Sequence, residues 1–304
     1  MNLAITGSSG LIGTAVTQYF YDRQCQVTRI CRESTKDQSG SSIVHWDVPS
    51  QTIDTSNLEA VDVVIHLAGA NIAARRWSTH YKSEILKSRV EGTGLLCRSL
   101  AQLKNPPKVL VSASAVGFYG IQESSNPLDE LSLRGDGFLS DVCAQWEAAT
   151  QPALDAGVRI VHLRFGMVLS TRGGALAKML PPFRFGLGGP MGCGRQMISW
   201  VALEEIPPIL AHIISHDHIR GAVNVVSPQA VSNLEFTKTL GRVIHRPTIF
   251  PIPSFGVKLL FGEMGETLLC GGQNVMPKKL IDDGYDFQYA SLEQALKACL
   301  LNGY

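Results

Sequence analysis

Three glycines near the start of the chain have the spacing of a phosphate-binding turn, Gly-x-x-Gly-x-x-Gly. They follow a short apolar run, residues 3–5, and precede a helical pattern over 11–21. Gly7 would allow a sharp turn, Gly10 a close approach of the backbone to a phosphate, and Gly13 close packing of the helix on the strand. Free N–H groups of the first helical turn would then face an anion, although a structural turn without a ligand also requires glycine. We therefore predict a nucleotide site that comprises Gly7, Ser8, Ser9, Gly10, Leu11, Ile12 and Gly13.

The end of the second expected strand, over 26–31, indicates which coenzyme would bind. Folds that bind NAD usually place Asp or Glu at this point, on the ribose 2′-hydroxyl. This chain has Cys31 and Arg32 instead, and a guanidinium can hold a 2′-phosphate through two donors. We therefore predict NADP(H) as the cofactor, with a solvated loop position for Arg32 as the alternative. Asp47, after a short strand over 43–46, would meet the adenine amino group or cap a turn.

Further cofactor contacts are expected where the later strands end. An apolar strand over 61–67 ends in small residues, which would let a flat ring or a ribose lie against the backbone. Arg89, on a long helix expected over 79–103, could reach a phosphate or a ribose, with Glu84 as its candidate partner. An exposed charge pair without consequence is the alternative for these two residues. The predicted contacts on this side of the site are Leu67, Ala68, Gly69, Glu84, Arg89 and Ser112.

The elements that must position these residues alternate between strand and helix. Crossovers between the apolar runs are too long for hairpins, which predicts an α/β fold with a Rossmann-type, doubly wound parallel sheet. Beyond residue 166 the composition of the sequence changes, and residues 184–200 are rich in glycine with arginines at intervals. We expect a Rossmann domain over 1–166 and a smaller C-terminal α+β substrate lobe over 167–304, with segments near 200–226 returning to the Rossmann domain.

Composition and charge exclude several classes of protein. The chain has 304 residues, 45% of them hydrophobic, and a formal net charge of +1. Such a chain can fill a core, and its scattered charges do not favour binding to nucleic acid or to an anionic membrane. No apolar run approaches the ~20 residues of a membrane span, and the first strand begins at residue 2, which leaves no room for a signal peptide. We expect a cytoplasmic protein.

Cysteine and histidine spacing gives no metal signature. The seven cysteines form no C-x-x-C pair, which favours reduced thiols in a cytosolic protein. His216 and His218 flank Asp217 on a short expected loop, with no cysteine or third ligand nearby in the sequence. We therefore predict no metal site.

The ordered motifs resemble a known family, the extended short-chain dehydrogenase/reductases of the nucleotide-sugar epimerase type. More narrowly, the chain is similar to an atypical subgroup, the NADP-binding, NAD-dependent-epimerase-like proteins. The resemblance implies a Rossmann domain, bound NADP(H), a C-terminal lobe for a small-molecule substrate such as a sugar derivative, and, by analogy, a homodimer formed through two long helices. It is carried by Thr6-Gly7-x-x-Gly10-x-x-Gly13, His66-Leu67-Ala68-Gly69, Ser112-x-Ser114, Tyr119-Gly120, Leu163-Arg164, Leu180-Pro181-Pro182-Phe183, Trp200-Val201 and Gly272-Gln273-x-x-x-Pro277-Lys278.

The family's usual catalytic pair is missing. Its enzymes use a Ser or Thr after the fifth strand and a Tyr-x-x-x-Lys on the next long helix, which is expected here over 138–156. Counting from Ser114, Cys143 stands at the place of the Tyr and Glu147 at that of the Lys. A neighbouring Glu would raise, not lower, the pKa of a thiol. This departure weighs against ordinary ketone reduction.

Two interpretations of the missing pair stay open. In the first, Ser114, Tyr119 or Cys143 performs acid–base chemistry in an NADP-dependent oxidoreductase or epimerase, and an Arg of the second lobe binds an anionic substrate. In the second, the protein binds NADP(H) without turnover and acts as a regulatory module. The structural alternatives are a Ser114 bonded to the backbone, a Tyr119 packed in its turn and an inert, buried Cys143.

Overall fold

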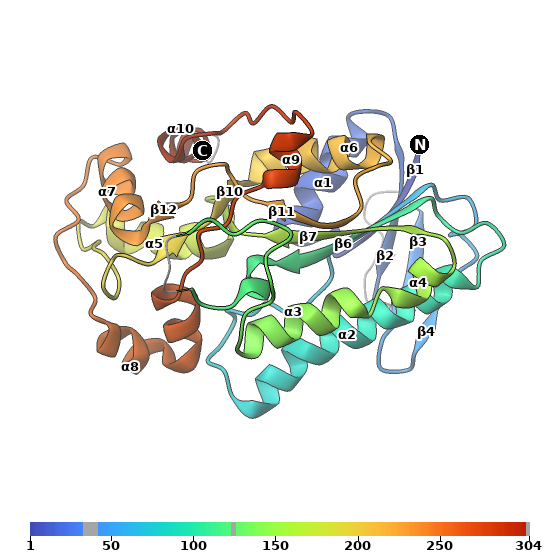
Figure 1. Ribbon diagram of the computed structural model, residues 1–304, viewed down its shortest axis with the longest axis horizontal. Helices are drawn as coiled ribbons and strands as arrows, with labels where there is room; N and C mark the ends of the chain where they lie inside the picture. Colours follow the sequence, from blue (N-terminus) through green and yellow to red (C-terminus); the bar gives the residue numbers. More distant parts are fainter. Residues whose placement is uncertain (33–41, 123–125, 302–304) are drawn as a thin grey trace.

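An eight-stranded sheet forms the centre of the computed structural model, which describes residues 1–32, 42–122 and 126–301 (Figure 1). The strand order is β11-β7-β6-β5-β1-β2-β3-β4, and all neighbours pair in parallel except the short β4, which is antiparallel to β3. This order confirms the predicted doubly wound, Rossmann-type fold. The strands are β1 (Asn2–Thr6), β2 (Gln26–Cys31), β3 (Ile43–Asp47), β4 (Thr52–Ile53), β5 (Val63–His66), β6 (Val109–Ala115), β7 (Arg159–Phe165) and β11 (Gly221–Val225).

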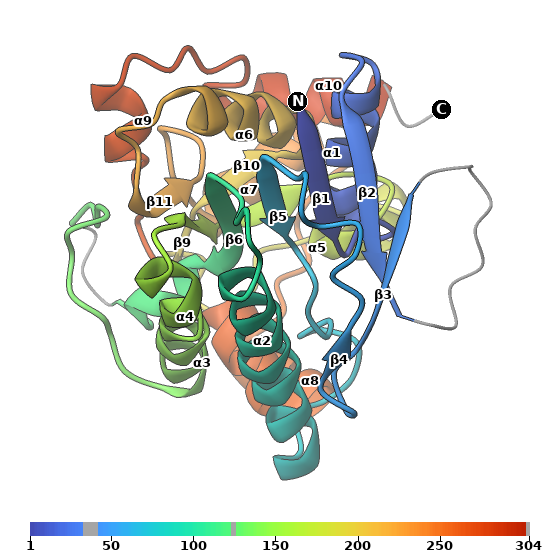
Figure 2. The same cartoon turned by 90° about the vertical axis from the view of Figure 1, so that its right-hand side faces the viewer.

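Helices cover both faces of this sheet. In Figure 2, α1 (Leu11–Tyr21) and α6 (Ile206–Ser215) lie on one side, whereas α2 (Thr79–Ala101), α3 (Phe138–Ala148) and α4 (Gln151–Asp155) lie on the other. Successive residues of β1 alternate between these layers. Leu3 and Ile5 belong to the apolar cluster with α1 and α6, and Ala4 belongs to the cluster with α2. Burial on both faces explains why the strands read as continuous apolar runs.

The C-terminal part of the chain builds a further apolar cluster, which includes Leu180, Trp200 and Phe236. Two small sheets contribute to it, because β8 pairs with β10 and β9 with β12. Figure 1 shows α5, α7 and α8 grouped at one end of the central sheet. The elements are β8 (Met167–Leu169), α5 (Gly174–Arg184), β9 (Met197–Ile198), β10 (Trp200–Ala202), β12 (Val231–Ser232), α7 (Asn233–Val243), α8 (Ser254–Gly265), α9 (Lys278–Asp282) and α10 (Leu292–Leu301).

One expected helix is wrong. The single helix predicted over 138–156 is divided into α3 and α4, because Pro152 in the first turn of α4 lacks the N–H that a continuous helix needs. β6 reaches Ala115, where a 3₁₀ turn over Val116–Tyr119 follows. Within the described part of the chain, no helix combines the length and the apolar character needed to cross a bilayer.

Candidate functional site

The glycine-rich turn brings β1, α1 and the end of β5 into direct backbone contact. Gly7 has a φ of +67°, and a Cβ there would lie 2.9 Å from the backbone nitrogen of Ala68. A Cβ on Gly13 would lie 2.1 Å from the carbonyl oxygen of Gly7. No side chain caps α1 at Gly10, so a backbone approach to the first helical turn is left open. The turn therefore has the form that dinucleotide pyrophosphates bind.

The polar side chains beside this turn come from β2. The Nε of Arg29 donates a hydrogen bond to the Oγ of Ser8 at 3.0 Å, and the Sγ of Cys31 lies 4.0 Å from the same oxygen. Arg32 is exposed at the end of β2, next to residues 33–41, which lie outside the described part. Asp47 accepts a hydrogen bond from the Oγ of Ser50 at 2.7 Å, as expected of a residue that stabilises a turn.

Arg29 is a candidate that our sequence reasoning missed. The signal was available, because Arg29 is the charged residue of this strand and stands two residues before Cys31. Side chains two positions apart on a strand point to the same face, so a contact of Cys31 with the turn implies one for Arg29 as well.

A buried chain of hydrogen bonds holds the end of β5 against β1. The Oγ1 of Thr6 accepts from the backbone N–H groups of Leu67 at 3.0 Å and Ala68 at 3.2 Å, which leaves its proton for the Nδ1 of His66 at 2.7 Å. The Nε2 of His66 lies 2.8 Å from the Oγ1 of Thr93. Burial lowers the pKa of His66 to about 4, so the imidazole is neutral at neutral pH.

We expect His66 to make the protein acid-sensitive. The unfolded chain takes up a proton at His66 near pH 6.5, whereas the folded chain resists it down to about pH 4. This contribution to stability is therefore fully present above pH 6.5, and about 3 kcal/mol is lost as the pH falls through this window. Urea unfolding of the wild type and of His66→Gln at several pH values measures it. Equal slopes of unfolding free energy against pH would contradict the assignment.

Arg89 lies beside the loop that follows β5. A Cβ on Gly69 would lie 3.4 Å from the Cζ of Arg89, and this Cζ lies 4.9 Å from the centre of the Trp146 ring. The predicted pairing with Glu84 is wrong. Glu84 forms an ion pair with Arg75, because residues five positions apart on a helix point about 140° away from each other. Among the described residues, no carboxylate forms an ion pair with Arg89, and its Nη1 donates to the carbonyl oxygen of Ile85 at 3.1 Å.

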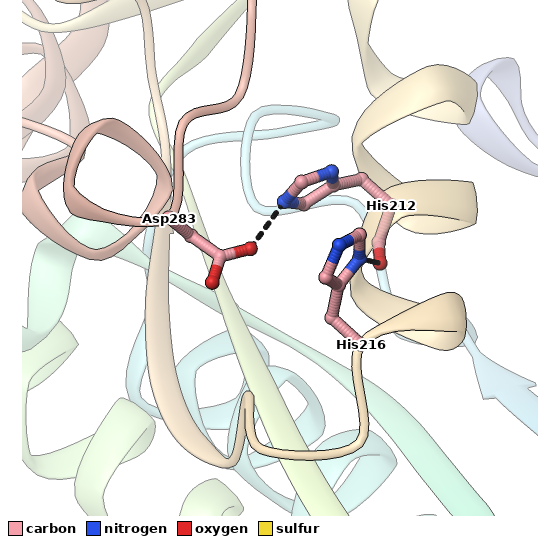
Figure 3. Close-up of side chains that lie close together, drawn as sticks. All are labelled: His212, His216 and Asp283. Atoms are coloured by element: carbon pink, nitrogen blue, oxygen red, sulfur yellow. Dashed lines mark hydrogen bonds and ion pairs between the residues drawn. The ribbon is translucent and has the colours of Figure 1, made fainter.

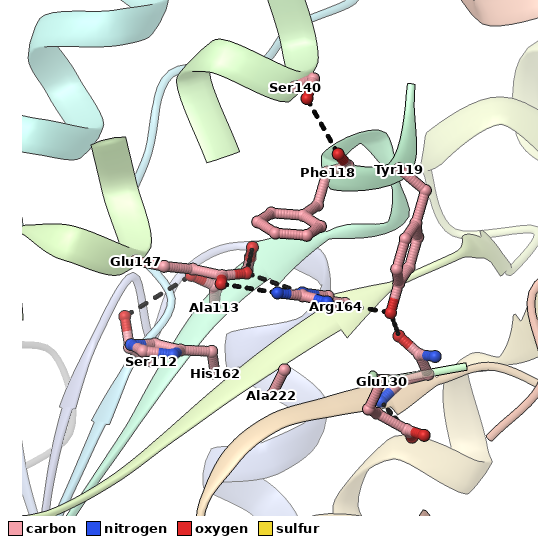
Figure 4. A network of polar contacts seen from close by, with 12 residues as sticks. Ser112, Ala113, Phe118, Tyr119, Glu130, Ser140, Glu147, His162, Arg164 and Ala222 are labelled. Carbon is pink, nitrogen blue, oxygen red and sulfur yellow. Dashed lines mark hydrogen bonds and ion pairs between the residues drawn. The ribbon is translucent and has the colours of Figure 1, made fainter. Parts of the chain in front are cut away.

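Glu147 and Arg164 form the ion pair of a largely buried polar network (Figure 4), which also includes Ser114. Arg164, at the end of β7, donates from Nε and Nη2 to the two carboxylate oxygens of Glu147, both at 2.9 Å. The Oγ of Ser114 donates to the Oε1 of Glu147 at 2.7 Å. Burial opposes the ionisation of Glu147, but Arg164 outweighs it and holds the pKa of Glu147 below its usual value. Glu147, at the expected place of a lysine, thus accepts hydrogen bonds from a strand serine and a strand arginine.

Tyr119 lies at the other end of this network. It is fully buried, and its hydroxyl donates to the Oδ1 of Asn224 at 2.7 Å and accepts from the Nη1 of Arg164 at 3.0 Å. Burial raises the pKa of Tyr119. Cys143 is also buried, and its burial together with the nearby Glu147 raises the pKa of its thiol to about 11. Ser114 and Tyr119 use their hydroxyls inside the protein, and Cys143 stays protonated at neutral pH.

The remaining predicted residues differ in how far their side chains are buried. Ser112 is buried, and its Oγ lies 3.5 Å from the carbonyl oxygen of Ala113. Ser9 is exposed, whereas Leu11, Ile12 and Leu67 are half-buried. Apart from Asp47 at the end of β3 and Glu84 and Arg89 on α2, the predicted cofactor residues lie at or just after the ends of β1, β2, β5 and β6, where the carboxyl ends of the parallel strands meet.

Comparison with known proteins places the chain in a family. An epimerase family protein of Mycobacterium bovis is 40% identical over 294 residues, which cover 97% of this chain and 96% of that protein. The chain belongs to the epimerase family. Residues 3–142 match the NAD dependent epimerase/dehydratase family, and residues 252–299 match a domain of unknown function. As its motifs predict, the chain is an atypical, epimerase-like extended short-chain dehydrogenase/reductase.

Solved structures of this family share the fold. The human epimerase family protein SDR39U1, described as a crystal structure with NADPH, superposes with a TM-score of 0.87 at 35% identity and covers 99% of this chain and 100% of its own. The UDP-glucose 4-epimerase of Thermus thermophilus, in complex with NAD, has a TM-score of 0.77 at 17% identity, with 100% and 99% of the chains covered. At that identity the likeness concerns the fold alone.

Proposed function

We propose that this epimerase family protein binds NADP(H) along the turn from Gly7 to Gly13. The observation that carries the proposal is the contact of Arg29 with Ser8, which places a guanidinium beside a turn that has no room for a Cβ at Gly7 or Gly13. Backbone N–H groups of the turn would hold the pyrophosphate, and Arg29 with Arg32 would hold the 2′-phosphate. The NADPH in the human relative's structure supports the same coenzyme.

Removing either arginine is expected to change coenzyme preference. A charge-assisted hydrogen bond contributes about 1.5–3 kcal/mol, so Arg29→Ala and Arg32→Ala would each weaken NADPH about 10- to 100-fold and leave NADH nearly unchanged. Calorimetric titration with both coenzymes measures this difference. Arg23→Ala, two residues beyond the carboxyl end of α1, is the matched control. Equal weakening of NADPH and NADH would rule out a 2′-phosphate contact.

For the chemistry, binding without turnover is the function that the geometry supports best. Ser114 and Tyr119 already donate their hydroxyl protons to Glu147 and Asn224, and the expected Tyr-x-x-x-Lys pair is replaced by Cys143 and Glu147. The stability of such a protein, or its binding to partners, would depend on the NADPH concentration around it.

A second candidate, an oxidoreductase or epimerase acting on a small polar substrate such as a sugar derivative, is favoured by Arg89 and Cys143. The thiol is protonated at neutral pH, and the guanidinium of Arg89 contacts no carboxylate among the described ion pairs. In a reduction, the coenzyme would supply a hydride to the carbonyl carbon. Cys143 would supply the proton to its oxygen, and Arg89 would hold an anionic group of the substrate.

NADPH consumption separates the two candidates. The wild type is assayed with a panel of carbonyl compounds and nucleotide sugars, and Cys143→Ser and Ser114→Ala are assayed beside it. No consumption and no epimerised product, with NADPH binding intact in all three proteins, supports binding without turnover. Consumption that Cys143→Ser slows at least about 10-fold supports the enzyme, because general acid catalysis typically contributes 10²- to 10⁴-fold.

A further inference from the structure

A cluster of histidine and aspartate side chains lies away from the glycine turn, at the carboxyl end of α6 (Figure 3). His212 and His216 are four residues apart on this end of the helix, and Asp283 directly follows α9. The Nε2 of His212 lies 2.6 Å from the Oδ2 of Asp283. One ligand atom from each of the three residues lies within 4.8 Å of the others. We propose that these three residues form a binding site for a divalent transition-metal ion of the zinc class.

This proposal departs from our sequence interpretation. We predicted no metal site because no third ligand lies near His216 and His218 in the sequence. The third ligand is supplied by Asp283, which is 71 residues from His212 in the sequence and reaches it only through the packing of α9 beside β11.

His216 is oriented in the way that metal ligands usually are. The Nδ1 of His216 lies 2.7 Å from the carbonyl oxygen of His212, so its N–H donates there and its Nε2 keeps a free lone pair. A backbone carbonyl that fixes the second ring nitrogen is the usual outer contact of a metal-bound imidazole. The two rings stack with centroids 4.1 Å apart, so both imidazoles are held on one side of the helix.

A fourth ligand is close. His218 forms a hydrogen bond through its Nε2 with the other carboxylate oxygen of Asp283, and its ring lies 5.8 Å from that of His216. His218 is largely exposed and can rotate, whereas His212 and Asp283 are mostly buried. Three imidazoles and one carboxylate would complete a tetrahedral site.

The chemistry of these donors selects the ion. Zn²⁺ binds imidazole nitrogen and carboxylate oxygen at about 2.0–2.2 Å, in a tetrahedral arrangement that needs no backbone oxygen. Mg²⁺ and Ca²⁺ prefer oxygen ligands in larger numbers. An ion would replace the proton now shared between His212 and Asp283, and those two atoms would move slightly apart to admit it.

The positive charges near the cluster are already compensated. Arg159 donates to the backbone carbonyls of Ile213, Ile214, His216 and Ile219, and its Nη2 lies 3.5 Å from the carboxylate of Asp217. The Nζ of Lys279 is bonded to the carbonyl oxygens of Arg220 and Ala222. An ion bound here would connect α6 to the turn after α9 and stabilise that side of the fold without touching the coenzyme turn.

The test is calorimetric titration of the full-length protein with ZnCl₂, combined with its melting temperature. All proteins carry Cys193→Ser, because Cys193 is exposed and a free thiol would also bind zinc. We expect one ion per chain and a raised melting temperature. His216→Ala and Asp283→Asn should each weaken binding by about 100-fold or more, since losing a ligand costs more than the 10–100-fold typical of an outer contact. His80→Ala, an exposed histidine on α2, is the matched control.

The visible absorption of bound Co²⁺ reports on the metal ligands themselves, so a folding defect does not produce the same signal. Co²⁺ held by nitrogen and oxygen ligands in a tetrahedral site absorbs strongly in the visible range, and Asp283→Asn, which preserves the shape of the side chain, should lose that band. If the protein that carries only Cys193→Ser and the His216→Ala and Asp283→Asn variants bind zinc with equal affinity, the ion binds elsewhere and the proposal is overturned. The absence of heat and of any change in melting temperature with excess Zn²⁺ would also overturn it.

Discussion

Gly13→Ala is expected to abolish NADP(H) binding and to destabilise the fold. The added Cβ would lie 2.1 Å from the carbonyl oxygen of Gly7 and 2.8 Å from the Cα of Ser8. Both atoms are backbone, so no side chain can rotate away, and α1 must move off the turn. Overpacking a tight contact costs about 1–3 kcal/mol and occasionally more, and this contact is far inside van der Waals distance. We expect a loss of at least about 3 kcal/mol and more than 100-fold weaker NADPH binding, because the pyrophosphate donors move with the helix.

The matched control is the same substitution at Gly94, in the interior of α2. The nearest atom to a Cβ there is the Nη1 of Arg98 at 3.0 Å, the end of a flexible side chain that can move. Alanine is favoured over glycine inside a helix by about 1 kcal/mol, so Gly94→Ala should leave stability unchanged or raise it slightly. Urea unfolding and NADPH titration of both variants make the comparison. If Gly13→Ala binds NADPH as tightly as Gly94→Ala, the coenzyme does not lie on the turn.

The glycine turn and the central sheet could be predicted from sequence because their causes are local. The close approach of α1 to β1 requires a residue without a side chain at Gly13. The regular spacing of the glycines in the sequence therefore indicates this contact directly. Strands such as β5 are buried on both faces, so they appear as uninterrupted apolar runs. The break between α3 and α4 also has a local cause, Pro152, but our prediction of one continuous helix did not take this proline into account.

The ionic network and the histidine cluster could not be predicted in the same way, because their members meet only through the fold. Glu147 comes from α3 and Arg164 from the end of β7, and the parallel pairing of β6 with β7 sets Ser114 opposite Arg164. Counting along the sequence placed Glu147 correctly on the helix but gave no partner for it. Asp283 and His212 are 71 residues apart in the sequence, and they meet because α9 packs on the same side of the sheet as α6, so proximity in the sequence could not reveal their contact.

Glu147→Gln is expected to be the most destabilising single change of charge in the described part of the chain. The side chains of Glu147 and Arg164 are only 12% and 5% exposed, and removing the carboxylate leaves a guanidinium buried between Phe118 and Tyr119 without a counter-ion. Breaking a buried pair by removing one partner costs about 3–5 kcal/mol, because the remaining charge stays desolvated. Ser114 loses its charged acceptor at the same time. Urea unfolding, with the slope checked for two-state behaviour, measures the loss.

Asp282→Asn provides the matched control, since Asp282 pairs with Lys278 at the surface, where both side chains are about half exposed. Exposed pairs contribute at most about 1 kcal/mol, so this variant should lie well below Glu147→Gln in its effect. The double variant Glu147→Leu with Arg164→Met should recover much of the lost stability, because an apolar pair of similar volume removes both buried charges together. A double variant as unstable as Glu147→Gln would mean that the loss comes from the hydrogen bonds of Ser114 and Tyr119, and not from an unpaired charge. Recovery with intact NADPH binding would show that the network supports the strand ends without contacting the coenzyme.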